Sequence, residues 1–163
     1  MSDEAEHKGA GEIAPGGRFY QAERWESLRP DQPHVWRTLG SRRLVWEPGR
    51  SVIEWDATPE YSFPASSGWI VHGGMVATLL DTAMGGAAWT VLDEHEVFLT
   101  ADLRVEFLRA ARPGTLRAEA GVLRRGSRVV FCEASLFDAE GRQLAAARCT
   151  QIIQPADSST GGR

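Results

Sequence analysis

Hydrophobic and polar residues follow two different periods along the chain. Between Gly73 and Trp89 the apolar residues recur at steps of three and four, which is typical of one face of an α-helix. From Thr100 the period is two, as in a half-buried β-strand. The helical stripe expected to pack on a sheet comprises Met75, Val76, Leu79, Leu80, Ala83, Met84 and Ala87.

Shorter segments on both sides of this helix predict the rest of the fold. Segment 58–71, which contains Pro64 and Gly68, predicts a loop that leads into the helix. No strand alternates with helices as in a parallel sheet, and the short connections after the helix favour an antiparallel meander of four strands. The pattern therefore predicts an α+β domain with one helix against a sheet. Short helices are predicted at 19–28 and 33–40, and strands at 43–46, 51–57, 115–123, 128–137 and 143–153, besides the strand from Thr100.

Length and composition set limits on the class of protein. At 163 residues the chain is long enough for one domain with its own core, and we place the folded unit at 18–154 between disordered tails at 1–17 and 155–163. A net charge of −4 argues against a nucleic-acid partner. The acidic N-terminus is unlike a signal peptide, and no apolar run reaches the length of a membrane span.

The two cysteines bear on the compartment. Cys132 and Cys149 lie in apolar stretches and lack CxxC spacing. This arrangement favours buried free thiols over a disulfide, which predicts a cytoplasmic protein.

The start of the helix carries the candidate chemistry. Gly73 and Gly74 follow His72, and glycines at a helix start leave backbone N–H groups uncovered, where the helix dipole also favours negative charge. Two turns later Asp81 is the only acidic residue of the helix, a candidate base or nucleophile. Its neighbours on one stripe are small, so spacing alone also allows close packing of the glycines beside a solvated Asp81.

Three strings, HGGMVATLLDTAMGGAAW, LTADLRVEFLRAARPG and GSRVVFCEASLFDAEGRQLAAA, resemble the PaaI-type branch of the hotdog-fold acyl-CoA thioesterases. The resemblance covers residues 35–153. It implies a single hotdog domain, in which an antiparallel sheet wraps a long central helix. It also implies a homodimer, or a tetramer of two dimers, with active sites at the subunit boundary.

The resemblance assigns roles to individual residues. The Gly73 N–H matches the group that polarises the thioester carbonyl, and Gly74 belongs to the same substrate-binding motif. Asp81 matches the acid that activates water or attacks the carbonyl, and Thr100 matches a hydroxyl that orients the water in some members. Many relatives have an asparagine shortly before the glycines, whereas this chain has Ser66-Ser67; Ser67 or a bound water would take that role.

Three further features have weaker assignments. We expect His72 to orient the motif rather than react. His95, in an acidic stretch, fits a solvated loop better than a metal site. Arg125 and Arg128 flank a Gly-Ser turn and are candidate contacts for the phosphates of coenzyme A, although ordinary surface charge is the alternative for each.

Together these features predict an enzyme that hydrolyses an aromatic or medium-chain acyl-CoA to the free acid and coenzyme A, with neither metal nor cofactor. Two other functions remain open on the same fold. One is a noncatalytic acyl-CoA-binding module, and the other is a hydratase or dehydratase that leaves the thioester intact.

Overall fold

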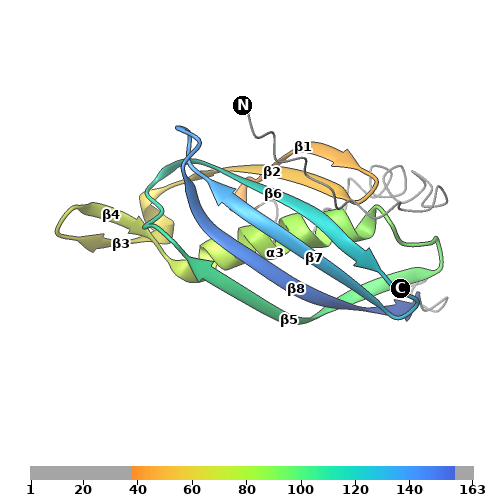
Figure 1. The fold of residues 1–163 in the computed structure, drawn as a ribbon. Helices are drawn as coiled ribbons and strands as arrows, with labels where there is room; N and C mark the ends of the chain where they lie inside the picture. Colours follow the sequence, from red (N-terminus) through yellow and green to blue (C-terminus); the bar gives the residue numbers. More distant parts are fainter. Residues whose placement is uncertain (1–37, 157–163) are drawn as a thin grey trace, which may run out of the picture.

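The computed structural model describes residues 38–156. One six-stranded antiparallel sheet, in the order β1-β2-β6-β7-β8-β5, curves around the helix α3 (Gly73–Trp89), as Figure 1 shows. This arrangement confirms the predicted α+β class and the single hotdog domain. The strands of the sheet are β1 (Arg42–Glu47), β2 (Arg50–Ala57), β5 (Glu96–Phe107), β6 (Gly114–Arg125), β7 (Val129–Phe137) and β8 (Gln143–Pro155).

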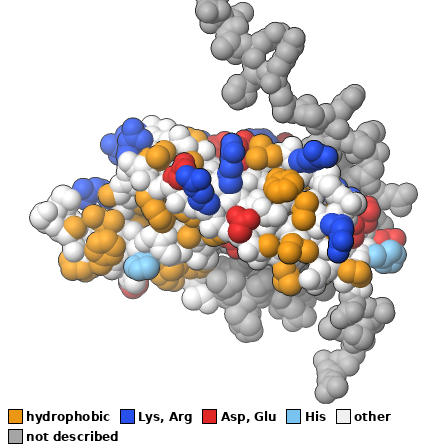
Figure 2. Space-filling model, turned by 60° about the horizontal axis from the view of Figure 1, so that its bottom comes forward, with side chains coloured by type: hydrophobic (Ala, Val, Ile, Leu, Met, Phe, Trp, Pro, Cys, Tyr) orange, Lys and Arg blue, Asp and Glu red, His pale blue; other side chains and the backbone are white. Residues whose placement is uncertain are grey.

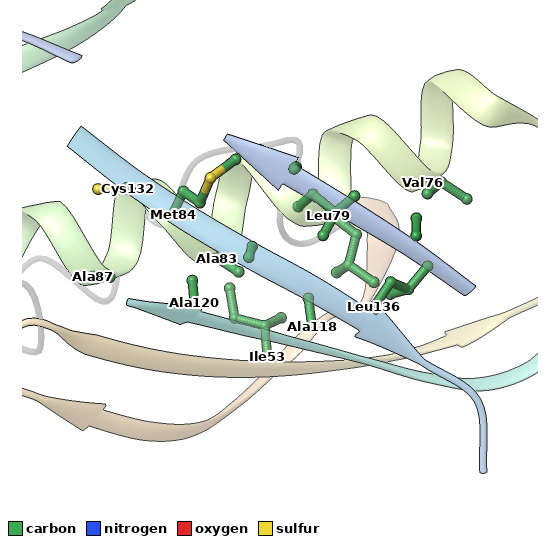
Figure 3. Packing of buried hydrophobic residues seen from close by; sticks show 14 of the residues in the cluster. Ile53, Val76, Leu79, Ala83, Met84, Ala87, Ala118, Ala120, Cys132 and Leu136 are labelled. Atoms are coloured by element: carbon green, nitrogen blue, oxygen red, sulfur yellow. The ribbon is translucent and has the colours of Figure 1, made fainter. Parts of the chain in front are cut away.

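The core lies between α3 and the inner face of the sheet. Leu79, Leu80 and Met84 are at most 2% exposed. Leu79 and Met84 point toward the sheet (Figure 3), where α3 mainly crosses the strands β2, β6 and β7. Small residues such as Ala118 and Ala120 on β6 leave room for these large side chains. Each fully buried leucine contributes about 2 kcal/mol to stability by leaving water. The stripe predicted from the sequence is buried except for Met75, which is partly exposed, and Ala88 adds to it.

The two cysteines lie within this core on neighbouring strands. Cys132 on β7 pairs in register with Cys149 on β8, and both are free and buried, as predicted. The neighbouring thiol and burial together raise the pKa of Cys132.

The segment before the helix is not the loop that was predicted. A short 3-10 helix, η2 (Pro59–Tyr61), leads into a two-stranded hairpin of β3 (Ser62–Ala65) and β4 (Gly68–Val71). Pro64 indicated a loop, but in an isolated two-stranded ribbon a strand has one free edge, where the missing N–H is tolerated. Gly68 has φ +105°, a conformation that favours glycine, directly after the Ser66-Ser67 turn.

The predicted four-strand meander is also wrong for one strand. β5 pairs with β8 at the far edge of the sheet, so only β6, β7 and β8 form a meander. The reason is that residues 108–113 form a crossing segment rather than a tight turn. The amides of Leu108 and Arg109 both bond to the carbonyl of Leu144, and the carbonyl of Ala111 accepts from Val71, so this segment passes the end of β8.

The strand β5 is therefore an edge strand, and its apolar side chains are more exposed than the period of two predicted. Leu99 is 60% exposed and Phe107 is 58% exposed, since α3 contacts this edge strand less than it contacts β2, β6 and β7. A register shift between Thr100 and Asp102 marks a bulge in the same strand.

Some predictions cannot be compared with the described residues. The helix at 19–28 and most of the helix at 33–40 lie outside them, although Thr38 and Leu39 are helical. Strand β8 extends to Pro155, one residue into the predicted C-terminal tail. Among residues 38–156, no helix combines the length and apolar character needed to cross a membrane.

Candidate active site

The first turn of α3 leaves one backbone amide available. His72 is the N-cap, and its Nδ1 accepts a hydrogen bond from the Gly74 N–H at 3.0 Å. The amides of Met75 and Val76 both bond to the His72 carbonyl. The amide of His72 bonds to the Tyr61 carbonyl, so among residues 38–156 the Gly73 N–H is the one of the four amides without an intrahelical acceptor that is left for a ligand oxygen. The capping bond also supports the orienting role predicted for His72.

Asp81 and Thr100 are brought together by the packing of α3 beside β5. The Thr100 hydroxyl donates to Asp81 Oδ1 at 3.1 Å. Partial burial raises the pKa of Asp81 above the ordinary value of an aspartate, while the Thr100 hydrogen bond acts in the opposite direction. A carboxylate in this setting is a stronger base than a solvated one.

Gly73 and Asp81 of one chain are far apart. They are separated by eight positions of α3, and a rise of 1.5 Å per residue places them about 12 Å from each other along the helix axis. An oxyanion donor and a base acting on one thioester each need to lie about 3 Å from the reacting atoms. The separation of the two backbone positions along the helix axis is longer than this reach.

An apolar hollow of about 330 Å³ opens beside Gly73. Its walls include Ile70 and Val76, together with Phe107 and Leu108 from the end of β5. The ring of Phe107 covers Gly73 closely, since a Cβ added to Gly73 would lie 3.2 Å from the ring atom Cζ. A larger hollow of about 890 Å³ lies elsewhere, over the outer face of the sheet, and charged side chains from Arg50, Arg104, Glu119 and Glu133 line it.

Ser67 lies away from the helix start, in the turn of the β3–β4 hairpin. The four residues of β4 separate it from His72, a length of about 13 Å at 3.3 Å per residue. Arg112 donates to both the carbonyl and the Oγ of Ser67, the second at 3.0 Å. Within one chain, Ser67 thus contacts Arg112 rather than the Gly73 amide.

The two arginines proposed for coenzyme A lie near the opposite end of α3 from Gly73. Arg125 donates to both carboxylate oxygens of Glu96, at 2.7 and 2.6 Å. Arg128 is exposed on the turn between β6 and β7. Of these two side chains, Arg128 is the more accessible to a phosphate. His95 is 88% exposed, in agreement with the predicted solvated loop.

Two contributors to this region were missed in the sequence. Arg112 gave no signal of its own, because its contact with Ser67 depends on the unpredicted hairpin. Gln151 is 0% exposed on β8, next to Thr100 in the register. A signal for it did exist, because Gln151 continues the inward series of Ala145, Ala147 and Cys149 with a polar side chain.

Comparison with known proteins identifies the family. Residues 69–145 match the model of the thioesterase superfamily. The protein named "Putative esterase SSO2140" of Saccharolobus solfataricus is 32% identical over 117 residues, which are 72% of this chain and 81% of that protein. The chain belongs to the thioesterase superfamily. A second relative is the medium/long-chain acyl-CoA thioesterase YigI of Escherichia coli, which is 31% identical over 97 residues. The match covers 52% of this chain and 63% of YigI.

Solved structures of the superfamily share the fold. A thioesterase family protein from Silicibacter pomeroyi has 27% identity and a TM-score of 0.73, covering 83% of this chain and 98% of that one. The PaaI protein of Escherichia coli, at 19% identity, has a TM-score of 0.71 over 82% of this chain and 93% of PaaI. The resemblance to PaaI-type hotdog thioesterases is thereby confirmed, whereas the roles of individual residues stay predictions.

Proposed function

We propose that this chain is an acyl-CoA thioesterase in which Asp81 supplies the base or nucleophile and the Gly73 N–H stabilises the oxyanion. The observation that carries the proposal is the Asp81–Thr100 pair. It is a partly buried carboxylate with a raised pKa, held by a hydroxyl on the open side of α3. The similarity to YigI supports acyl-CoA as the class of substrate.

The proposed reaction begins with the thioester carbonyl oxygen on the Gly73 amide. As Asp81 removes a proton from water, the water oxygen attacks the carbonyl carbon and negative charge grows on the carbonyl oxygen, where the amide and the helix dipole stabilise it. The tetrahedral intermediate then expels the coenzyme A thiolate, which takes the proton from Asp81. In the second route, an Asp81 oxygen attacks first and the carbon–sulfur bond breaks to release the thiolate; water then hydrolyses the mixed anhydride to the free acid and regenerates Asp81.

We further propose that the site is completed by a second copy of the chain. The distance of about 12 Å between Gly73 and Asp81 within one chain supports this assembly, because each group then acts with its counterpart from the partner. The twelve residues of β5 form an exposed edge, a template for pairing with another strand. Figure 2, with the lower edge of Figure 1 turned toward the viewer, shows hydrophobic side chains spread over this side among isolated charged ones.

The acyl group would occupy the apolar hollow beside Gly73. Its volume of about 330 Å³ is at the lower end of small-molecule pockets and suits an aromatic ring or a medium chain. Arg128, exposed at the turn after β6, remains a candidate contact for the phosphates of coenzyme A. The free buried thiols support the cytoplasm as the compartment of the reaction.

Release of free coenzyme A from a panel of acyl-CoAs tests the proposal. The panel contains phenylacetyl-, benzoyl-, hexanoyl- and decanoyl-CoA, and the proteins compared are the wild type and Asp81→Asn. We expect turnover by the wild type and a loss of about 10³-fold in kcat in the variant, because the amide cannot accept a proton from water.

Two results would replace the proposed function with one of its alternatives. Binding of acyl-CoA without turnover by either protein would indicate a noncatalytic module. Formation of 3-hydroxyacyl-CoA from an enoyl-CoA, with the thioester intact, would indicate a hydratase.

A further inference from the structure

Gln151 is a polar side chain that is buried in the apolar interior without a hydrogen-bond partner among residues 38–156. It is 0% exposed on β8, among inward-facing apolar side chains. Neither its Nε2 nor its Oε1 has a hydrogen-bond partner in the described part of the chain. Buried carboxamides normally find partners, so one that has none points to a small molecule or water that it binds.

The register of the sheet places Gln151 beside the proposed site. Gln151 pairs with Thr100 across β8 and β5, two neighbouring strands in Figure 1, and residues directly opposite in an antiparallel pair point to the same face. The Thr100 side chain faces α3, because its hydroxyl donates to Asp81. The carboxamide of Gln151 therefore lies on the α3 side of the sheet as well.

Gly85, which lies one helical turn after Asp81 on the same face of α3, locates the Gln151 carboxamide independently of the strand register. A Cβ added to Gly85 would lie 3.9 Å from Gln151 Nε2 and 3.1 Å from Phe98 Cζ. Gly85 follows Asp81 by one helical turn, and such residues are neighbours about 5–6 Å apart on a helix surface. Asp81, Thr100 and Gln151 thus form one short polar group between α3 and the edge of the sheet.

We propose that Gln151 is a positioning residue of the hydrolytic site, whose carboxamide holds a water that also contacts the Thr100 hydroxyl. This inference rests on the proposed function. The Thr100 hydroxyl gives its proton to Asp81 and so can only accept a further bond, while Nε2 offers two protons. A water that accepts from Nε2 and donates to Thr100 Oγ1 gives one amide proton an acceptor and strengthens the bond from Thr100 to Asp81.

The pKa of Asp81 is a measurable sign of the proposed water between Gln151 and Thr100. Within residues 38–156, the pKa of Asp81 depends on burial and on the Thr100 hydrogen bond, and no charged side chain contributes. A change at Gln151 acts on Asp81 through Thr100, since the carboxamide is itself uncharged. A merely space-filling Gln151 would leave the titration of Asp81 unchanged.

The experiment measures the Asp81 carboxyl titration by carbon-detected NMR, together with kcat and KM as functions of pH. For Gln151→Met, which keeps the size but not the polar atoms, we expect a higher pKa of Asp81, a fall in kcat of about tenfold and a KM within twofold of the wild type. Gln151→Glu places a carboxylate near Asp81 and raises that pKa further. Gln154→Met, an exposed residue of the same strand, is the matched control and leaves both quantities unchanged.

An Asp81 titration that is the same in Gln151→Met as in the wild type overturns the proposal. If Gln151→Met does not fold, Gln151→Asn takes its place, since it keeps the amide but shortens its reach, and the same shift is expected. The NMR readout does not depend on turnover. A shifted titration in a protein that hydrolyses no acyl-CoA would show that Gln151 is coupled to Asp81 through Thr100 and would refute the proposed reaction, and with it the role in hydrolysis.

Discussion

The two sides of α3 differ in burial and in hydrogen bonding: the core side carries buried apolar residues such as Leu80, and the open side carries the partly exposed Asp81. Leu80 is 0% exposed in an apolar core, and its neighbour Asp81 lies on the open side of the helix with one hydroxyl as its donor. The core side is complete within one chain. The open side has the raised pKa of Asp81 and the exposed edge of β5, and beneath it lies the buried carboxamide of Gln151, which has no hydrogen-bond partner within residues 38–156. Stability and chemistry are therefore assigned to different faces of one helix, and mutations should separate them.

The largest effect is expected at the amide of Gly73. Gly73→Pro removes the N–H and adds a Cβ beside Phe107 without changing the backbone, because proline suits the first position of a helix and His72 already has ψ 133°, which a residue before proline requires. We expect kcat to fall by about 10² to 10³, the usual loss for one oxyanion donor. Gly73→Ala adds the same Cβ beside Phe107 but keeps the N–H, and it should stay within about tenfold of the wild type.

Mixing two inactive variants tests whether the open side needs a partner. Asp81→Asn and Gly73→Pro, unfolded and refolded together, would form mixed dimers in which one site is intact and the other carries both changes. Activity should then return in the mixture. Persistent inactivity, with mixed dimers demonstrated by mass spectrometry, would place both groups in one chain and contradict the proposed assembly.

The core side should respond in stability. Leu80→Ala leaves a cavity in a close-packed interior and should lower the free energy of unfolding by about 3 kcal/mol in urea titrations. Its kcat under stabilising conditions should be close to that of the wild type.

Asp81→Asn is the counterpart on the open side. The folded protein raises the pKa of Asp81, so the contribution of this group to stability is fully present below the ordinary aspartate pKa and is lost as the pH rises through the folded value. At neutral pH the variant should therefore be at least as stable as the wild type, with the difference vanishing in acid. A clear destabilisation at pH 7 would indicate a structural role for Asp81.

The smallest effect is expected from Thr100→Val, which removes the hydroxyl but keeps the side-chain shape. Because the hydroxyl lowers the pKa of Asp81, its loss should raise that pKa and move the acidic limb of kcat/KM to higher pH. The fall in kcat at the optimum should be about tenfold. An unmoved acidic limb would mean that Thr100 does not influence the ionisation of the catalytic group.

Local patterns predicted most of the elements but not their long-range arrangement. The helical period found α3 at the start that the structure shows, because an apolar stripe at steps of three and four is a local signal. The position of β5 depends on the crossing segment 108–113 and its bonds to Leu144, and neither periodicity nor turn residues encode such pairing. The β3–β4 hairpin was missed because Pro64 is unfavourable in a central strand but tolerated in a ribbon.

For the site, the sequence indicated individual residues but not most of their contacts. The resemblance singled out Asp81 and Thr100 separately, and the hydrogen bond between them is a finding of the structure. The contact of Ser67 with Arg112 was not anticipated, since it joins residues 45 positions apart through an unpredicted hairpin. Gln151 was overlooked because it lies in a strand whose apolar alternation dominates the pattern.

Cys132 on β7 and Cys149 on β8 lie opposite each other, so the chemical reactivity of their thiols reports on separation of these two strands. Cys132 and Cys149 are at most 3% exposed, and the raised pKa of Cys132 keeps its thiol protonated. Neither thiol can attack a disulfide reagent until the two strands separate, so the labelling rate measures how often they do so. A strand edge that gains a partner subunit should open less often, and slower thiol labelling at higher protein concentration would record the association.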